Sequence, residues 1–145
     1  MQSKGKVLVT GGTGFIGTEL VKQLHQKGYE ITILDRKDKP IELDYVKYIQ
    51  GDLDNPAKCV FACAGQDYII HLAAKARIPE SFINPDEYFD SNVTGTRNIL
   101  TAASAVGVKK FVYAGSSSVY GNNTAPNKPT HKPDPLNYYA MSKLF

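Results

Sequence analysis

The sequence predicts an α/β fold, a doubly wound parallel sheet of about five strands, on three observations. Short apolar runs rich in β-branched residues alternate with segments of helical periodicity along the 145 residues, as in βαβ units. A glycine-rich turn, Gly11–Gly17, joins the first such run to the first helical segment. The run Tyr68–Ala74 is almost continuously apolar, which is typical of a strand buried on both faces of a parallel sheet.

The composition excludes several classes of protein. With 42% hydrophobic and 21% charged residues, the chain is an ordinary globular sequence, long enough for one domain with its own core. The net charge of +3 is scattered, and no Lys/Arg run with interleaved aromatic residues indicates nucleic-acid binding. No apolar run approaches the ~18–20 residues of a membrane span, and the N-terminus has no signal-peptide core. We therefore expect a cytoplasmic protein with no nucleic-acid or membrane partner.

The first strand, turn and helix predict a phosphate-binding site. Val7–Thr10 is a β-branched run, and Thr18–Lys27 is amphipathic. Between them, Gly11 permits a sharp turn, Gly14 leaves room for a pyrophosphate, and Gly17 permits close packing of the helix on the strand. The phosphates are then expected on the free N–H groups at the positive end of the helix. Taken alone, the same glycines also fit a tight turn that binds nothing.

The second strand, Glu30–Asp35, ends in a carboxylate at the spacing that suits a dinucleotide. An acidic residue about 20 positions after the glycines accepts hydrogen bonds from the adenosine ribose hydroxyls. Asp35 repels a 2′-phosphate, so NAD is favoured over NADP. Arg36 and the lysines that follow it offset part of that repulsion, so NADP stays possible.

The remaining elements follow in alternation. The expected order is a strand at Val46–Gln50, a helix from an Asn55–Pro56 cap to about Ala64, a strand at Tyr68–Ala74, a helix over Asp86–Val106, a strand at Lys110–Ala114, a loop from Gly121 to Pro135 and a last helix beginning near Asp134–Pro135. Because that last helix is short, we expect the chain from about Tyr120 onward to be poorly ordered or held by a second copy.

Two cysteines, Cys59 and Cys63, are four residues apart in a predicted helix. They are interpreted as small buried apolar residues rather than a redox pair or half of a metal site, because no other Cys and no nearby His accompanies them. No metal site is predicted.

A second group of polar residues follows the fifth strand. Tyr139 and Lys143 are spaced i, i+4, so they share one face of a helix, and Ser116 follows the strand. An exposed amphipathic pair is the alternative. An unperturbed phenol ionises near pH ~10, so a tyrosine base needs a nearby cation at neutral pH. An ammonium group supplies one, and a serine hydroxyl polarises a substrate oxygen.

Together these motifs resemble the N-terminal part of an extended short-chain dehydrogenase/reductase, from the NAD-dependent epimerase/dehydratase family of nucleotide-sugar enzymes. The matching stretches are Thr10-Gly-Gly-Thr-Gly-Phe-Ile-Gly17, Gly51-Asp-Leu53, His71-Leu-Ala-Ala74, Asn92-Val-Thr-Gly-Thr96, Ser116-Ser-Ser-Val-Tyr-Gly121 and Tyr139-Ala-Met-Ser-Lys143. They cover the whole chain in the family's order. The resemblance implies a Rossmann-type fold.

The resemblance also assigns roles. Ser116, Tyr139 and Lys143 become the catalytic residues, with Tyr139 as the acid/base and Lys143 bound to the nicotinamide ribose. The predicted cofactor-binding residues are Gly11, Gly14, Phe15, Ile16, Gly17, Asp35, Arg36, Asp52, Leu53, Leu72, Ala73, Ala74, Asn92, Tyr139 and Lys143. Asn92 is also readable as a helix-face polar residue, and His71 as a satisfied core histidine, so His71 is left out of the site.

Two departures from the family pattern narrow the prediction. Dehydratases carry Asp-Glu where this chain has Ser117–Ser118, which favours an epimerase or reductase. Family members are also roughly twice as long, so we expect residues 1–145 to be one incomplete NAD(P)-binding domain that lacks the C-terminal substrate lobe, with no second domain.

The predicted function is therefore an NAD-dependent nucleotide-sugar epimerase, present as an N-terminal fragment. In such an enzyme, an isomerase that works by oxidoreductase chemistry, NAD removes hydride from the sugar C4 while Tyr139 takes the hydroxyl proton. A non-catalytic dinucleotide-binding module and a reductase of small carbonyl compounds are the alternatives. A nucleotide-diphospho sugar is the expected partner, and a homodimer is possible.

Overall fold

The structure is a computed structural model that describes residues 2–145. Its elements are β1 (Lys6–Thr10), α1 (Phe15–Gln26), β2 (Glu30–Asp35), a 3-10 turn η1 (Ile41–Leu43), β3 (Lys47–Gln50), α2 (Pro56–Cys63), β4 (Tyr68–His71), α3 (Ile78–Ile83), α4 (Pro85–Phe89), a π-helical turn η2 (Asp90–Thr94), α5 (Gly95–Val106), β5 (Lys110–Tyr113), a 3-10 turn η3 (Ser117–Tyr120) and α6 (Tyr138–Leu144). The chain forms two compact units. The first unit comprises the chain up to Ala73 and Gly95–Ala114, and the second unit comprises Ala74–Thr94 and Gly115–Phe145.

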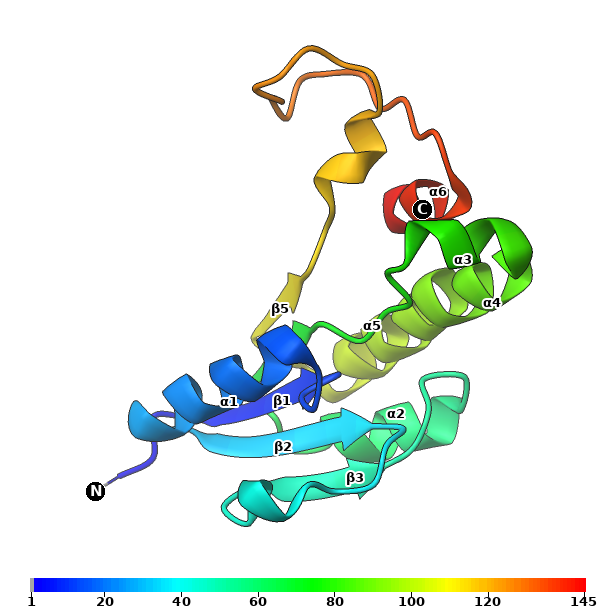
Figure 1. Cartoon of the computed structure of the whole chain (residues 1–145). Helices are drawn as coiled ribbons and strands as arrows, with labels where there is room; N and C mark the ends of the chain where they lie inside the picture. The colour runs from blue at the N-terminus through cyan, green and yellow to red at the C-terminus, as the bar shows by residue number, and fades with distance from the viewer. Residues whose placement is uncertain (1) are drawn as a thin grey trace. The chain divides into compact units, whose positions relative to one another are not determined.

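The first unit is a five-stranded, wholly parallel sheet in the order β3-β2-β1-β4-β5 (Figure 1). Val9 of β1 lies opposite Ile33 of β2 on one side and Ile70 of β4 on the other. The chain runs outward from β1 to β3 and then returns to add β4 and β5 on the other side of β1. This confirms the predicted doubly wound parallel sheet.

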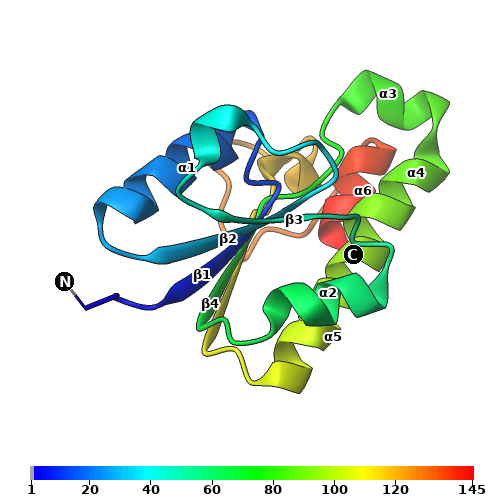
Figure 2. The ribbon, with the colours of Figure 1, turned by 90° about the horizontal axis from the view of Figure 1, so that it is seen from below.

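Helices cover both faces of this sheet, with α1 on one face and α2 and α5 on the other (Figures 1 and 2). Alternate residues of each strand enter different cores because successive side chains point to opposite faces. Val7 and Val9 pack in the core under α1 with Val21, whereas Leu8 packs with Ile99 of α5 in the other. A strand buried on both faces cannot alternate apolar with polar residues, which explains the continuous apolar runs in the sequence.

The second unit is helical and contains α3, α4, α6 and the turns η2 and η3. Within it α6 packs against α3 and α4. The ring of Tyr138 meets Phe82 edge-on at 5.8 Å, and Phe145 lies 6.2 Å from Phe89. These contacts come from the same chain, and they contradict the expectation that the chain from about Tyr120 onward is poorly ordered or held by a second copy.

Several predicted bounds differ from the structure. The helix expected over Asp86–Val106 is interrupted by the π turn η2, and α3 was not predicted. The last helix begins at Tyr138 rather than near Asp134, because Asn137 caps it by accepting a hydrogen bond from the Ala140 N–H at 2.7 Å. β4 ends at His71 rather than Ala74, since the Ala73 N–H turns to the Thr10 side chain.

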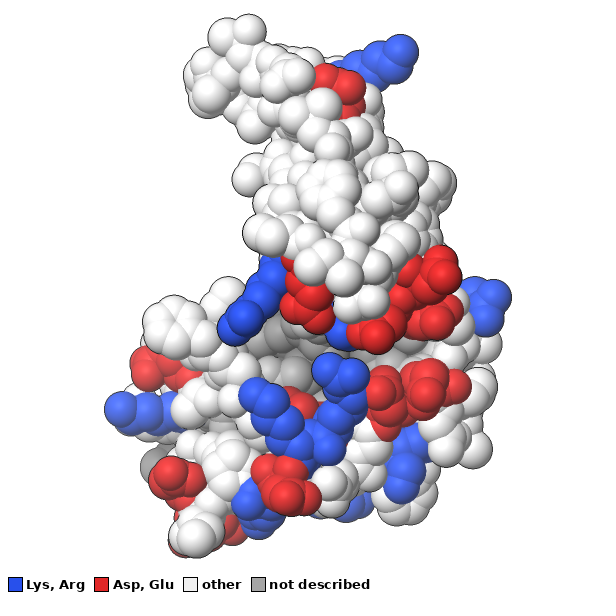
Figure 3. All heavy atoms as spheres, turned by 45° about the vertical axis from the view of Figure 1, so that its right-hand side comes forward, with Lys and Arg blue, Asp and Glu red and all other residues white. Residues whose placement is uncertain are grey.

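The surface carries both signs of charge. Lys and Arg side chains are interspersed with Asp and Glu on the face shown in Figure 3. Among residues 2–145, no helix is both long and apolar enough to cross a bilayer.

Candidate functional site

The turn after β1 is tight at both ends. Gly11 has φ +69°, and a Cβ on it would lie 2.8 Å from the Cα of Ala73. A Cβ on Gly17 would lie 2.4 Å from the Gly11 carbonyl oxygen, closer than any real Cβ contact. Both positions therefore require glycine, Gly11 for its conformation and for space, Gly17 for space alone.

Gly14 is different because the space at its side-chain position is almost empty. It is the N-cap of α1, and a Cβ there would meet only the Gly11 carbonyl oxygen, at 3.3 Å. No side chain caps the helix and no acidic residue lies in its first turn. The free N–H groups and the positive helix end are thus left for an external anion, which is what a bound pyrophosphate needs.

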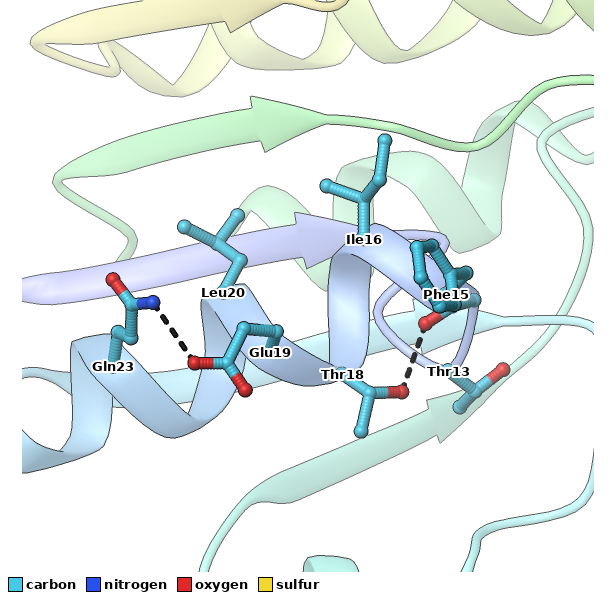
Figure 4. Close-up of a pocket in the computed structure, with 8 residues that line it drawn as sticks. Thr13, Phe15, Ile16, Thr18, Glu19, Leu20 and Gln23 are labelled. Carbon is cyan, nitrogen blue, oxygen red and sulfur yellow. Dashed lines mark hydrogen bonds between the residues drawn. The ribbon is translucent and has the colours of Figure 1, made fainter.

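An open hollow of about 820 Å³ runs from this turn along the outer side of α1 (Figure 4). Phe15 and Ile16 flank it and are 99% and 68% exposed. Thr18 anchors the first turn, with its Oγ1 donating to the Gly14 carbonyl at 2.8 Å. These two residues, which were predicted to bind the cofactor, are therefore accessible to a ligand.

Asp35 lies at the end of β2 and is held in place from two directions. Its Oδ2 accepts hydrogen bonds from the Thr13 N–H at 3.2 Å and from Thr13 Oγ1 at 2.7 Å. Its Oδ1 accepts a bond from the Lys37 N–H at 3.3 Å. The carboxylate that was predicted to bind the ribose is therefore fixed next to the glycine turn before any ligand arrives. Thr13, which orients it, was not among the predicted site residues.

Three further residues predicted to bind the cofactor follow the ends of β2 and β3, which are neighbours in the sheet. Arg36 and Asp52 form an exposed ion pair at 3.6 Å. Leu53 is 6% exposed and packs in the core under α2 and α5, while its carbonyl accepts a bond from Asn98 at 2.8 Å. The cofactor role of Leu53 stays a prediction, and its side chain serves the core.

His71 is a satisfied core histidine. It is 1% exposed, its Nδ1 lies 2.6 Å from Thr10 Oγ1, and its Nε2 lies 2.8 Å from Thr96 Oγ1. The same Thr10 oxygen accepts the Ala73 N–H at 3.2 Å. Leu72 and Ala73, which follow His71, are half-buried beside the cores. Leaving His71 out of the site agrees with this packing.

Within the second unit, Asn92 is buried, and its side-chain amide forms hydrogen bonds with both backbone groups of Lys75. The Lys75 N–H donates to Asn92 Oδ1, and Asn92 Nδ2 donates to the Lys75 carbonyl, both at 2.9 Å. Lys75 follows Ala74, a predicted cofactor contact. The Lys75 ammonium forms ion pairs with Glu80 at 3.4 Å and with Glu87. The structure thus places Asn92 where it holds the segment after β4.

Tyr139 and Lys143 lie one turn apart on α6. Lys143 is 9% exposed, and this burial lowers the pKa of its ammonium group. Tyr139 is half-buried. A buried cation one helical turn from a phenol is suited to stabilising a phenolate. The alternative interpretation, an exposed amphipathic pair, does not fit the burial of Lys143.

Ser116 caps η3, which packs against α6 in the same unit. Its Oγ accepts the Ser118 N–H at 3.2 Å and lies 2.7 Å from the Ser118 hydroxyl. The three predicted catalytic residues are therefore carried by two neighbouring elements of one compact unit.

Comparison with known proteins decides the family. The sequence model of the "NAD dependent epimerase/dehydratase family" matches residues 7–145. The chain belongs to this family. It is 37% identical over 156 residues to UDP-glucose 4-epimerase 3 of Oryza sativa subsp. japonica, covering 95% of this chain and 42% of that protein. It is 38% identical over 129 residues to a UDP-glucose 4-epimerase of Klebsiella pneumoniae, covering 81% of this chain and 93% of that protein.

A solved structure, MoeE5 in complex with UDP-glucuronic acid and NAD, superposes with a TM-score of 0.90 at 35% identity. The match covers 97% of this chain and 46% of that one. The chain thus spans less than half the length of MoeE5 and of the rice epimerase.

Proposed function

We propose that this chain forms the NAD-binding and proton-transfer part of a nucleotide-sugar 4-epimerase. The observation that carries the proposal is the buried Lys143, which lies one turn after Tyr139 on α6. The same chain has a glycine-rich turn at which the N-terminus of α1 is left without a side-chain cap and can bind an anion. The similarity to UDP-glucose 4-epimerases and to a structure with NAD and a UDP-sugar supports it.

The residues present fit a dinucleotide. The α1 N-terminus at Gly14 would hold the phosphates, since no Cβ and no acidic side chain blocks that position. Asp35 takes the adenosine ribose hydroxyls with the carboxylate that Thr13 holds, and its charge disfavours a 2′-phosphate. When bound, the nicotinamide accepts a hydride from the sugar C4 and later returns it.

This chain's own residues move the proton. Tyr139 accepts the proton of the sugar C4 hydroxyl as the C4–H bond breaks, which leaves a C4 ketone. Lys143 stabilises the phenolate, and Ser116 donates a hydrogen bond to the same substrate oxygen. When the hydride returns to the other face of the ketone, Tyr139 gives the proton back, so the sugar is inverted at C4 with no net oxidation.

Two measurements on the purified chain test the proposal. Calorimetric titration is expected to show NAD binding, tighter than NADP binding. Adding UDP-glucose to the NAD complex is expected to produce the absorbance of the reduced nicotinamide. Tyr139→Phe should keep NAD affinity within about threefold and lower the rate of that signal by about 100-fold or more, since it removes the acid/base. Tyr138→Phe is the matched control, because it deletes the neighbouring phenol and keeps the ring that contacts Phe82.

The outcomes separate the alternatives. NAD binding without any sugar-dependent signal, in this chain and in a version extended to the length of its relatives, contradicts catalysis and favours a dinucleotide-binding module. A signal with small ketones and none with UDP-sugars favours a reductase. A homodimer and a cytoplasmic location stay predictions from the sequence.

A further inference from the structure

We propose that Ser142 is a positioning residue, which with Asn92 forms a hydrogen-bonded strut that fixes Tyr139 and Lys143 relative to the segment Ala74–Lys75. The inference rests on the proposed function, because it concerns the placement of the same acid/base helix. Every residue of the strut lies in the second unit.

The first half of the strut is the Asn92 amide, which is 2% exposed. One N–H of its Nδ2 donates to the Lys75 carbonyl, and the other donates to Ser142 Oγ at 2.9 Å. Its Oδ1 accepts the Lys75 N–H. Both N–H donors of the Asn92 amide are therefore used. Through them Asn92 connects the segment at Lys75 to Ser142, which lies 50 positions after Asn92 in the sequence.

The second half is the Ser142 hydroxyl, which is fully buried at 0% exposure. It accepts the bond from Asn92 and donates its own proton to the Tyr139 carbonyl at 2.8 Å. One hydroxyl thus connects the Asn92 amide to the backbone of the catalytic tyrosine. Because Ser142 immediately precedes Lys143, the same bond also fixes the position from which the lysine side chain starts.

The backbone around Asn92 supports a functional reading. Asn92 is the central residue of the π turn η2, and single π turns within α-helices occur frequently at functional sites. Because π-helices are rare, a π turn that the fold retains is expected to have a compensating contact. The hydrogen bonds from Asn92 to Lys75 and Ser142 supply that contact.

Ser81 shows what a buried serine does without this partner. It is also 0% exposed, and its Oγ donates to the Ile78 carbonyl three residues back at 2.6 Å, as Ser142 does to Tyr139. Among residues 2–145, the Ser81 hydroxyl forms no hydrogen bond to a second segment. The two serines differ mainly in the Asn92 bond, which makes Ser81 a matched control.

The test measures Lys143 directly by NMR. The chain is labelled with ¹³C-lysine, the Lys143 Cε signal is assigned with Lys143→Arg, and its titration is followed in the wild type, Ser142→Ala and Ser81→Ala. Ser142→Ala is expected to change the Lys143 shift and to raise its pKa towards the ordinary lysine value, because α6 is no longer held and the ammonium gains water. Ser81→Ala should leave the chemical shift and the pKa of Lys143 unchanged, while lowering the melting temperature of the chain about as much as Ser142→Ala does.

Further variants keep the result interpretable. Should Ser142→Ala fail to fold, Ser142→Cys has a similar volume and only a weak hydrogen-bonding group, so it is read in the same way. The double variant Asn92→Ala/Ser142→Ala should change the Lys143 signal no more than the larger single effect, since the two residues act as one unit. The proposal is overturned if the Lys143 chemical shift and pKa change equally in Ser142→Ala and Ser81→Ala. It is also overturned if the changes caused by Asn92→Ala and Ser142→Ala add up in the double variant.

The same experiment separates the strut from the enzymatic proposal. The NMR readout needs neither cofactor nor sugar, so it decides the strut even if the wild type never oxidises a UDP-sugar. Where activity is present, Ser142→Ala should lower kcat by about tenfold to 100-fold with little change in KM, since a small misplacement of an acid/base slows the reaction step.

Discussion

At the scale of single residues, the glycines of the first turn differ in what they do. Gly17 has no space for a side chain because the Gly11 carbonyl oxygen would lie 2.4 Å from its Cβ. Gly14 has ordinary backbone dihedrals, and its Cβ would make one close contact at 3.3 Å. One glycine is therefore required by the fold, and the other leaves room for a ligand.

Gly17→Ala is expected to cost about 1–3 kcal/mol of folding free energy, because either the turn or the helix has to move. Gly14→Ala should cost about 1 kcal/mol or less, as alanine is a poorer N-cap than glycine, yet weaken NAD binding by about tenfold or more. Urea denaturation and calorimetric titration measure the two effects separately. Unchanged NAD affinity in a folded Gly14→Ala variant would show that the pyrophosphate does not approach this position.

The candidate site residues come from the spacing of the glycines and of Tyr139 and Lys143, and from the resemblance to the family, and their roles stay predictions. The residues that were missed act through contacts that no spacing encodes. Thr13 bonds to Asp35 across 22 positions, and Ser142 bonds to Asn92 across 50. Hydrogen-bond partners of this kind depend on tertiary packing, so a single sequence does not indicate that Thr13 and Ser142 contact site residues.

At the scale of elements, α2 carries the two cysteines on its buried side. Both are 0% exposed. Burial, helped by the charges of Asp52 and Asp54, raises the pKa of the Cys59 thiol to about 11. Burial and the neighbouring Cys59 raise the pKa of Cys63 to about 12. The thiols are therefore protonated packing groups at neutral pH, in agreement with their interpretation from the sequence.

This predicts a pH dependence of stability. An unfolded cysteine ionises near pH ~8.5, whereas the folded thiols keep their protons to about pH 11 or beyond. Since the unfolded state then binds fewer protons, each thiol lowers the free energy of unfolding by up to about 1.4 kcal/mol per pH unit above pH ~9. Urea denaturation from neutral to alkaline pH should show a shallower decline for Cys59→Ala/Cys63→Ala than for the wild type. Parallel declines would contradict the buried, protonated thiols.

The elements of the first unit were predicted more accurately than those of the second. Strands such as Glu30–Asp35 are buried on both faces, so the sequence marks them strongly. The helical period over Asp86–Val106 does not mark the π turn at Asn92, and the short helix α3, which ends before Asn84 and Pro85, was not predicted. At the π turn, Asn92 hydrogen-bonds to Lys75 and Ser142, which only the folded chain brings together.

At the scale of the whole molecule, cofactor binding should stabilise the chain. A ligand that binds only the folded state at 100 times its Kd adds about 2.7 kcal/mol. For a chain of this length, that corresponds to a rise of about 5–10 °C in melting temperature. Differential scanning fluorimetry with NAD should show this rise, with a smaller one for NADP at equal concentration. Equal rises for the two cofactors would contradict the selectivity assigned to Asp35.

The doubly wound parallel sheet was predictable because it depends on the order of strands and helices rather than on their exact ends, and the family was predictable from its motifs. Alternating strands and helices with right-handed crossovers leave few topologies, and β3-β2-β1-β4-β5 is one of them. The division into two compact units was not predicted, because it depends on contacts among α3, α4 and α6 that the sequence period does not reveal.

The path of the chain between these units limits how the molecule can be dissected. The second unit is made of two stretches separated by Gly95–Ala114, which belongs to the first unit. Neither unit is therefore a contiguous gene segment, and stopping translation at Ala73 yields a sheet without β5 and without the α5 side of its core. Swapping the helices of the second unit between relatives requires two simultaneous grafts, with α5 and β5 left untouched between them.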